Sequence, residues 1–390
     1  MTRPGSASTS PEHWDVVIVG AGPAGSAAAL GALAEVPDLR VLLLDRSDFP
    51  RDKVCGDGIA PHALDELERI GVRGIDDGWS PVRRIELALG DDTVSSERPR
   101  LGWVIPRSVF DARLVERATA AGAVLGRHRA VEVTRSDGVV TVDDVATADV
   151  VVGADGPYSI TRAAAGLPPT GRRALALRGY VPTPARWEGA QVIRFGERRR
   201  PSYAWAFDRG DGLCNVGYGE VLGAEPHPPT RFLLLDELEH LLPGATVGGG
   251  ESWKAHQLPL SGWRWEQPDG PVLLAGDASG LVNPMTGEGI YYAVATGIRA
   301  GRAAASAVRS GDPGTAGRAY RRSVRRLLAT HLRHTSVAAR LARMPVTVHA
   351  GIRAASGSEP VFDDLLELGL GRGRITPRLA RGLLTHLAAR

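Results

Sequence analysis

The sequence is poor in cysteine. Its 390 residues include only two cysteines, Cys55 and Cys214. Two thiols cannot form a disulfide framework or a cysteine-based metal cluster. We therefore predict no metal site and a reducing compartment, which is the cytoplasm.

Long apolar runs and a strong net charge are also missing. No apolar stretch reaches the roughly 18 residues that a membrane-spanning helix needs. The polar N-terminus, Met1 to His13, lacks the apolar core of an export signal, and we expect it to be a flexible leader. A formal net charge of +3 is too balanced to suggest a nucleic-acid partner. What is present, 43% hydrophobic residues, suffices for a large core and one to three domains.

Positive charge is concentrated in one segment near the C-terminus. Leucine and alanine alternate there with eight arginines, Arg318, Arg321, Arg322, Arg325, Arg326, Arg333, Arg340 and Arg343. Two interpretations stay open: a solvated helix face, or an interfacial helix drawn to anionic lipid.

The most informative pattern lies near the N-terminus, between residues 15 and 45. A buried strand leads into a glycine turn and an alanine-rich helix, and a second strand ends at Asp45. Gly20 permits the tight turn, Gly22 lets the backbone approach a pyrophosphate, and Gly25 lets the helix pack against the strand. The pyrophosphate would lie at the helix N-terminus. Asp45 can accept hydrogen bonds from ribose hydroxyls, so the pattern predicts a dinucleotide site.

Three more constellations carry chemistry. In Phe49–Gly58, glycines around Cys55 let the chain pass close to a flat group. In the second, Asp155-Gly156 follows a buried strand, and Asp155 can cap the next turn. In the third, Asp277 ends a strand that we expect beside the first one and can bind a sugar-like hydroxyl. The glycines that follow, Gly287 and Gly289, aim a helix N-terminus whose dipole can stabilise negative charge on a reduced ring.

The middle of the chain has a different character. From Ala174 to about Pro259 apolar and polar residues alternate, and most of the Trp and Tyr occur here, which predicts an antiparallel sheet with one face on a pocket. Residues 203, 205 and 207 would share one strand face. Before this stretch, Ser108 is expected to cap a helix that runs to Ala121, with Asp111 completing a weak capping box. The last part of the chain is expected to be mostly helical.

In their order, the four constellations resemble flavoproteins of the para-hydroxybenzoate hydroxylase type over roughly residues 14–310. The resemblance implies an α/β fold with a split Rossmann-like FAD-binding domain, an inserted antiparallel β-sheet substrate domain and a C-terminal helical segment. The expected bounds are 14–80, 101–173 and 264–312 for the FAD domain, 81–100 and 174–263 for the substrate sheet, and 313–390 for the helical segment. The implied cofactor contacts are Gly20, Gly22, Pro23, Ala24, Gly25, Asp45, Arg46, Cys55, Gly56, Arg107, Val131, Asp155, Gly156, Gly276, Asp277, Gly287 and Gly289.

A more specific resemblance is to the geranylgeranyl reductases. It rests on Lys53–Gly58, on Tyr203-Ala-Trp205-Ala-Phe207 and on Asn215-Val-Gly-Tyr-Gly219, with Asp208 standing where the family usually has proline. It implies reduction of C=C bonds in a prenyl chain, with Cys55, Tyr203 and Trp205 at the reaction end. Cys55 is expected to act at the flavin ring, as a proton donor or as a lining group. For each aromatic residue, simple core packing stays open.

The resemblance also implies partners and rivals. The electron donor would be NAD(P)H or a ferredoxin-like protein, and the substrate a prenyl-chain lipid. The protein would be cytoplasmic, with a peripheral contact to a membrane surface. The main alternative is an FAD-dependent aromatic or lipid hydroxylase of the same fold. A halogenase would carry Trp-X-Trp-X-Ile-Pro, which is missing here, and a flavin-binding carrier without activity is a third interpretation. Chain length, head group and oligomeric state are not encoded in these motifs.

Overall fold

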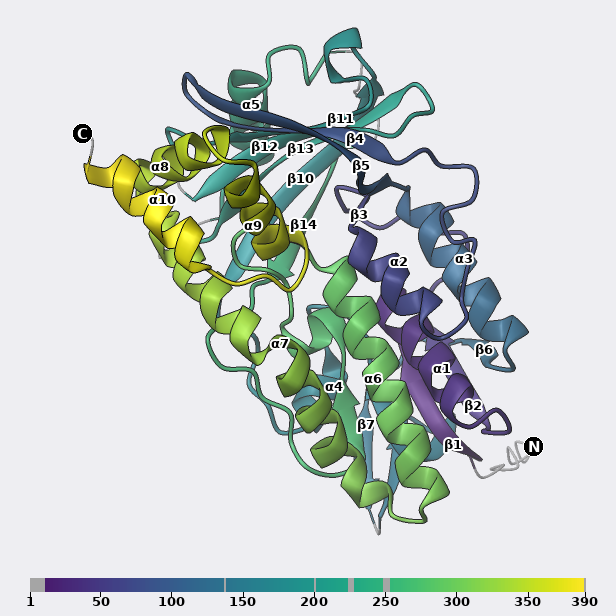
Figure 1. Cartoon of the computed structure of the whole chain (residues 1–390). Helices are drawn as coiled ribbons and strands as arrows, with labels where there is room; N and C mark the ends of the chain where they lie inside the picture. Colours follow the sequence, from purple (N-terminus) through teal and green to yellow (C-terminus); the bar gives the residue numbers. More distant parts are fainter. Residues whose placement is uncertain (1–10, 137, 200, 224–227, 248–252, 389–390) are drawn as a thin grey trace.

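Two β-sheets and a group of C-terminal helices make up the structure (Figure 1). The computed structural model describes residues 11–388 except 137, 200, 224–227 and 248–252. Among the described residues, no helix is long and apolar enough to cross a membrane.

The first sheet carries the N-terminal glycine turn. Its strand order is β6-β2-β1-β9-β8-β7, and β15 also pairs with β9. The strands are β1 (Glu12–Val19), β2 (Val41–Asp45), β6 (Val124–Arg127), β7 (Val133–Ser136), β8 (Val139–Val142), β9 (Ala146–Gly153) and β15 (Val272–Leu274). The strands β6, β2, β1, β9 and β15 are parallel, while β7 and β8 add an antiparallel hairpin.

Both faces of this sheet are covered, which explains why its central strands are almost entirely apolar. Val16 and Ile18 pack against helices, whereas Val17 and Val19 pack toward the β7–β8 hairpin. The covering helices are α1 (Pro23–Glu35), α3 (Arg107–Ala120) and α6 (Ile290–Arg309), with α2 (Pro61–Glu68) beside them and α4 (Ile160–Ala164) on the other face. A Cβ at Gly301 would lie 1.9 Å from the carbonyl oxygen of Ala28, so α6 and α1 are in backbone contact.

The second sheet lies above the first in Figure 1. Its order is β14-β10-β13-β12-β11-β4-β5-β3. The strands are β3 (Gly58–Ile59), β4 (Val82–Leu89), β5 (Asp92–Val104), β10 (Arg173–Pro182), β11 (Ala190–Phe195), β12 (Ser202–Asp208), β13 (Leu213–Val221) and β14 (Lys254–Pro259). The predicted antiparallel sheet is confirmed, with one parallel pair: β4 enters from an earlier part of the chain and pairs with β11 in parallel.

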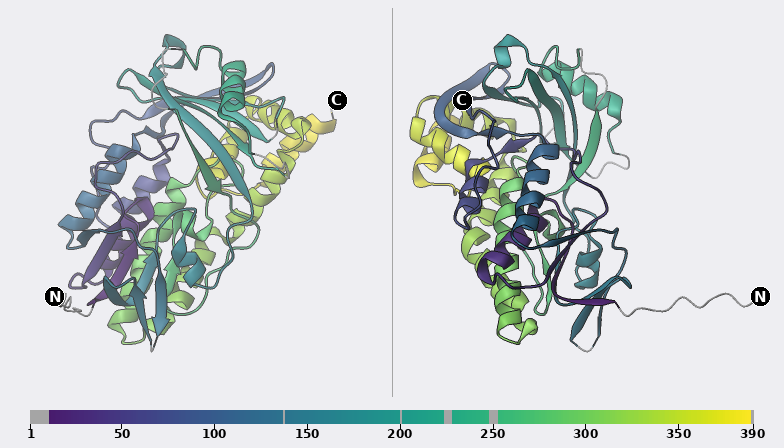
Figure 2. Two further views of the ribbon diagram at one scale, coloured as in Figure 1. Left: turned by 180° about the vertical axis from the view of Figure 1, so that it is seen from behind. Right: turned by 90° about the vertical axis from the view of Figure 1, so that its right-hand side faces the viewer.

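The two faces of β12 have different surroundings. Ala204 and Ala206 pack with α5 (Arg231–Leu241), whereas residues 203, 205 and 207 face the opposite way, toward a cavity. The predicted shared face is therefore confirmed. Figure 2 shows α5 on one side of this sheet and the C-terminal helices on the other.

The C-terminal segment is helical, as predicted. It contains α7 (Ala316–Leu341), α8 (Pro345–Ser356), α9 (Glu359–Leu370) and α10 (Pro377–Ala388). The apolar face of α7, including Tyr320, Val324 and Leu328, is buried in the first core, so it is not free to enter lipid. Most of the arginines that α7 carries are exposed, which favours the solvated-face interpretation.

Three local expectations are wrong. Glu12 and His13 belong to β1, so the expected leader cannot include them; residues 1–10 lie outside the described residues. Helix α3 begins at Arg107 after Pro106, which puts Ser108 inside the first turn rather than at the cap. The strand before Asp277 pairs with β9 and not with β1, because β9 occupies that side of the first strand.

Candidate active site

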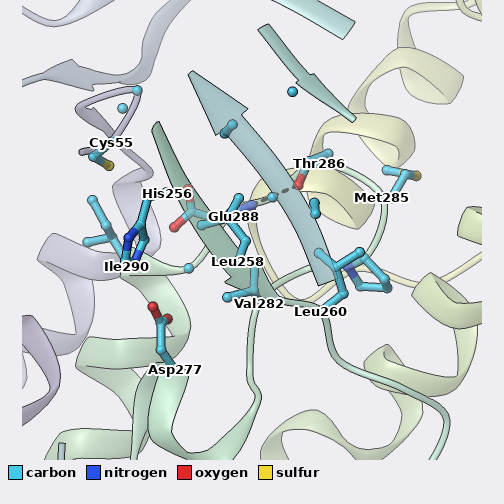
Figure 3. A pocket seen from close by; sticks show the side chains of 18 of the residues that line it. Cys55, His256, Leu258, Leu260, Asp277, Val282, Met285, Thr286, Glu288 and Ile290 are labelled. Carbon is cyan, nitrogen blue, oxygen red and sulfur yellow. Dashed lines mark hydrogen bonds between the residues drawn. The ribbon is translucent and has the colours of Figure 1, made fainter. Parts of the chain in front are cut away.

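A cavity of about 1000 Å³ connects all three parts of the fold. It starts at the carboxyl ends of β1 and β2, passes the aromatic face of β12, and continues between β4, β5 and the C-terminal helices. Figure 3 shows part of its wall, where Cys55, His256, Asp277 and Glu288 come from four separate segments. The topology therefore joins a polar arm at the first sheet to an apolar arm at the second.

Nearly all of the predicted site residues line this cavity. They are Gly20, Gly22, Pro23, Ala24, Asp45, Arg46, Cys55, Gly56, Arg107, Val131, Asp155, Gly156, Tyr203, Trp205, Asp277, Gly287 and Gly289. Gly25 and Gly276 are not in the cavity wall. A Cβ at Gly25 would lie 1.7 Å from the carbonyl oxygen of Gly20, and one at Gly276 would lie 3.0 Å from the Cβ of Ala24. Both glycines serve close packing, which is the role expected for Gly25.

The start of α1 suits a diphosphate. In the described structure no side chain caps this helix, and its first turn holds no acidic residue. Its free N–H groups and dipole therefore face the polar arm of the cavity without a competing anion. Gly22 has φ −70°, and within 4 Å of a Cβ there the only atom of the described residues is in the Arg51 guanidinium, at 3.5 Å. Gly22 thus leaves open the space that a pyrophosphate would occupy.

Carboxylates and arginines surround this arm in a fixed arrangement. Asp45 accepts a hydrogen bond from the Ala21 N–H at 2.9 Å. Arg107 is buried and bound through two nitrogens to Asp111, at 2.6 and 2.8 Å, and Asp111 also pairs with Arg51 at 3.2 Å. Bidentate pairing fixes the plane of a guanidinium. Two cations are therefore held at the polar arm, as an anionic cofactor requires.

Asp155 forms the predicted cap. Its carboxylate accepts hydrogen bonds from the Ser159 hydroxyl at 2.6 Å and from the Thr161 N–H at 3.1 Å. These bonds fix the turn after β9. Gly156, with φ +81°, follows in the left-handed region, and no described atom lies within 4 Å of a Cβ built there. The backbone at this turn is therefore open to the cavity. These features fit FAD at the polar arm.

The Cys55 loop is clamped onto the second sheet. Asn215 donates to the Cys55 carbonyl at 2.9 Å and to Asp57 at 2.8 Å, and Tyr180 donates to Asp57 at 2.5 Å. Asp57 itself adopts φ +60°. Burial raises the pKa of the Cys55 thiol to about 11, in spite of the nearby Arg107. The thiol is consequently protonated at neutral pH, and it is a weak acid.

A basic cluster at this loop was missed by the sequence analysis. Asp52 pairs with the buried Arg178 and, at 2.8 Å, with Lys254, while the Lys53 amine lies 3.0 Å from His256 Nε2. Burial, helped by Lys53, lowers the pKa of His256 to about 4. His256 is therefore neutral at physiological pH and can accept a hydrogen bond from Lys53. Its partner Lys53 lies 203 positions away in sequence, so no local pattern could have revealed the pair.

The aromatic face is part pocket and part core. Tyr203 lines the cavity and donates its hydroxyl to the carbonyl of Thr286. The Trp205 indole is only 5% exposed, donates to Asn215 at 2.9 Å and covers Gly217, where a Cβ would lie 2.2 Å away. The two interpretations left open for Trp205 therefore both hold: one edge packs in the core and the residue also lines the cavity.

The apolar arm was not predicted. Its walls come from β4 and β5 on one side and from α7 to α10 on the other. The lining residues include Ile85, Leu87, Leu101, Leu341, Gly351, Ile352, Leu365, Leu368, Leu379 and Leu383. The C-terminal helices were predicted, but no pattern in their sequences indicates that they enclose the cavity.

Glu288 lies between the predicted residues Gly287 and Gly289, but it was not itself predicted as a site residue. Its carboxylate lines the cavity and accepts the Tyr291 N–H at 2.8 Å, so this side chain caps α6. Burial raises the pKa of Glu288 to about 7. The start of α6 was expected to face a reduced ring. One of its N–H groups is instead hydrogen-bonded to Glu288.

Comparison with known proteins agrees with this geometry. The FAD binding domain family model matches residues 13–189. A digeranylgeranylglycerophospholipid reductase of Methanopyrus kandleri is 35% identical over 77% of this chain and 82% of that protein. A menaquinone reductase of Mycolicibacterium smegmatis is 34% identical over 76% of each.

A solved structure shares the whole fold. The geranylgeranyl bacteriochlorophyll reductase-like protein of Thermoplasma acidophilum superposes with a TM-score of 0.79 at 20% identity, covering 97% of this chain and 96% of that one. The motifs, the FAD-compatible arm and the similarity to named reductases all agree. The chain belongs to the geranylgeranyl reductase family of FAD-dependent oxidoreductases.

Proposed function

We propose that this protein saturates C=C bonds in the prenyl chain of a lipid. The observation that carries the proposal is the continuity of the cavity: the arm that suits FAD opens past Tyr203 and Trp205 into an arm walled by aliphatic side chains. A long hydrocarbon fits such an arm, whereas a small aromatic substrate would leave most of it unfilled. Relatives named as reductases of a digeranylgeranyl lipid and of menaquinone support the same substrate class.

The residues have separate tasks in this proposal. The α1 N-terminus with Gly22, the Asp45 carboxylate and the cations Arg46 and Arg107 would hold the dinucleotide part of FAD. When bound and reduced, FAD supplies a hydride to one carbon of the alkene. The aromatic face and Cys55 would position the double bond and exclude water from it.

Further features of the reaction belong to the same proposal. The electron donor is NAD(P)H or a ferredoxin-like protein that reaches the cofactor transiently. The protein is cytoplasmic and contacts the membrane surface that holds its substrate. Because the apolar face of α7 is buried, this contact would use the charge of the exposed arginines on α7 rather than an inserted helix.

Lipid analysis of cells tests this function. Cells with and without the chain are compared by mass spectrometry, with digeranylgeranyl lipid and menaquinone both supplied. We expect a lipid that gains pairs of hydrogen atoms only when the chain is present. The hydroxylase alternative predicts instead a gain of oxygen, and rapid NAD(P)H consumption with peroxide release by the purified protein.

A further inference from the structure

Glu288 stands where the aromatic face meets the polar arm. It precedes the Gly289 N-cap of α6, and its Oε1 accepts the Tyr291 N–H at 2.8 Å. Its own N–H donates to the Thr286 hydroxyl at 3.3 Å. The Thr286 carbonyl also accepts a hydrogen bond from the Tyr203 hydroxyl. Backbone and side chain are therefore both fixed, and Figure 3 shows Glu288 in the cavity wall with His256 and Leu258.

Several titratable groups face this carboxyl from the surrounding elements. They are Cys55 from the loop before β3, His62 from α2, Arg107 from α3, Tyr203 from β12 and Tyr292 from α6. Burial raises the pKa of both Cys55 and Tyr203, so neither gives up its proton readily at neutral pH. Burial also raises the pKa of the Glu288 carboxyl, to about 7, so this group can hold a proton at neutral pH while it lines the cavity.

We propose that Glu288 is the acid that protonates the alkene, a role that rests on the proposed function. The O–H bond of its carboxyl breaks, and a C–H bond forms at the alkene carbon that does not receive the hydride. The electron pair and the second hydrogen arrive with the hydride that the cofactor supplies. The products are one saturated C–C bond and the Glu288 carboxylate, which must then regain a proton.

The charge of His62 acts on the Glu288 carboxyl, and His62 is in turn linked to solvent. The His62 imidazole stacks edge-on against Tyr291, with 5.6 Å between ring centroids, and its Nε2 lies 3.2 Å from Glu367. Nδ1 of His62 is buried and has no hydrogen-bond partner among the described residues. The Glu367 side chain is 48% exposed, so it links His62 to solvent. In this proposal, His62 is the group through which a proton from solvent approaches the buried acid.

The test uses FAD-bound enzyme that has been reduced beforehand, in single turnover with a prenyl lipid. Glu288→Gln keeps a carbonyl oxygen for the Tyr291 N–H, so we expect it to fold and to bind FAD. We expect product formation to slow by about 100-fold, the lower end for a lost general acid. The wild-type rate should fall as pH rises above about 7, because only the protonated acid reacts. Cys55→Ser should keep that inflection.

A control variant and a second readout make the outcome decisive. Glu237→Gln alters a buried glutamate of α5 outside the cavity wall and should leave the rate unchanged. Difference infrared spectroscopy supplies a readout that does not depend on turnover. A protonated-carboxyl band should titrate near pH 7 in the wild type and be absent in Glu288→Gln.

A wild-type rate in Glu288→Gln, or the lack of such a band in the wild type, overturns this role. If Glu288→Gln does not fold, Glu288→Asp, which keeps the acid, must still show the falling rate at high pH. A wild-type enzyme that forms no reduced lipid contradicts the proposed function itself, while the infrared titration still decides whether Glu288 is a neutral-range acid.

Discussion

Replacing Gly22 with valine should remove FAD without unfolding the protein. Gly22 adopts φ −70°, which any L-residue tolerates, and the new Cβ would meet only the Arg51 guanidinium at 3.5 Å, an ordinary contact. The valine methyl groups would enter the space in front of the α1 N-terminus. If they displace the pyrophosphate from two backbone N–H groups, the loss is about 3 kcal/mol or more, since a hydrogen bond to a charged group contributes about 1.5–3 kcal/mol. That corresponds to a roughly 100-fold weaker Kd.

The assay is FAD content by visible absorbance and Kd by titration of the apoprotein, with thermal unfolding of the apoprotein as a measure of folding. Gly171→Val is the matched control, because Gly171 is outside the cavity wall and no described atom lies within 4 Å of a Cβ placed there. Gly25→Val should instead unfold the protein, since its Cβ would lie 1.7 Å from a carbonyl oxygen. Full flavin absorbance in folded Gly22→Val would refute the assignment of the phosphate site.

Three other perturbations probe the rest of the cavity. Trp205→Ala should lower the free energy of unfolding by about 3 kcal/mol, as for a buried aromatic, and cut prenyl reduction at least about tenfold; loss of FAD along with the fold would show that Trp205 serves only the core. Gly351→Leu places a side chain at the wall of the apolar arm, with its Cβ 3.7 Å from Leu383. The stability of helix α8 should rise by about 0.8 kcal/mol and FAD should stay bound, whereas long prenyl substrates should react more slowly than short ones. Equal rates for long and short substrates would argue against the apolar arm as the substrate site. The pKa of His256 is about 4 in the folded state against an ordinary 6.5, so its contribution to stability is complete above pH 6.5 and is lost as the pH falls toward 4. His256→Asn should therefore lose less thermal stability than the wild type between pH 6.5 and pH 4. An equal loss would contradict the burial of this neutral imidazole.

The nucleotide-binding half of the site could be predicted from sequence because its constraints are local. The turn at Gly20, with φ +101°, and the contact at Gly25 each demand glycine at a fixed place. The continuous apolar runs in the central strands of the first sheet indicate that both faces of that sheet are buried. The alternation in β12 likewise separates Tyr203, Trp205 and Phe207 from the residues that face α5.

The other half depends on contacts between distant segments. The pairs Lys53–His256 and Asp52–Arg178 join residues 203 and 126 positions apart, and neither member carries a distinguishing local pattern. The sequences of helices α8 to α10 indicate only amphipathic helices. Their place on the cavity follows from the packing of α8 and α9 against β4 and β5 and of α10 against α8 and α9. Glu288 lies between two predicted glycines, but its raised pKa is a consequence of burial, which only the folded structure reveals.

The most direct test of the account is the mass of the lipid product formed without oxygen. Purified FAD-bound protein is reduced under anaerobic conditions and mixed with digeranylgeranyl lipid or with menaquinone, and the products are measured by mass spectrometry. We expect the flavin to reoxidise as a prenyl chain gains two hydrogen atoms for each flavin consumed. Flavin that stays reduced until oxygen is admitted, followed by peroxide or an oxygenated product, would contradict the account.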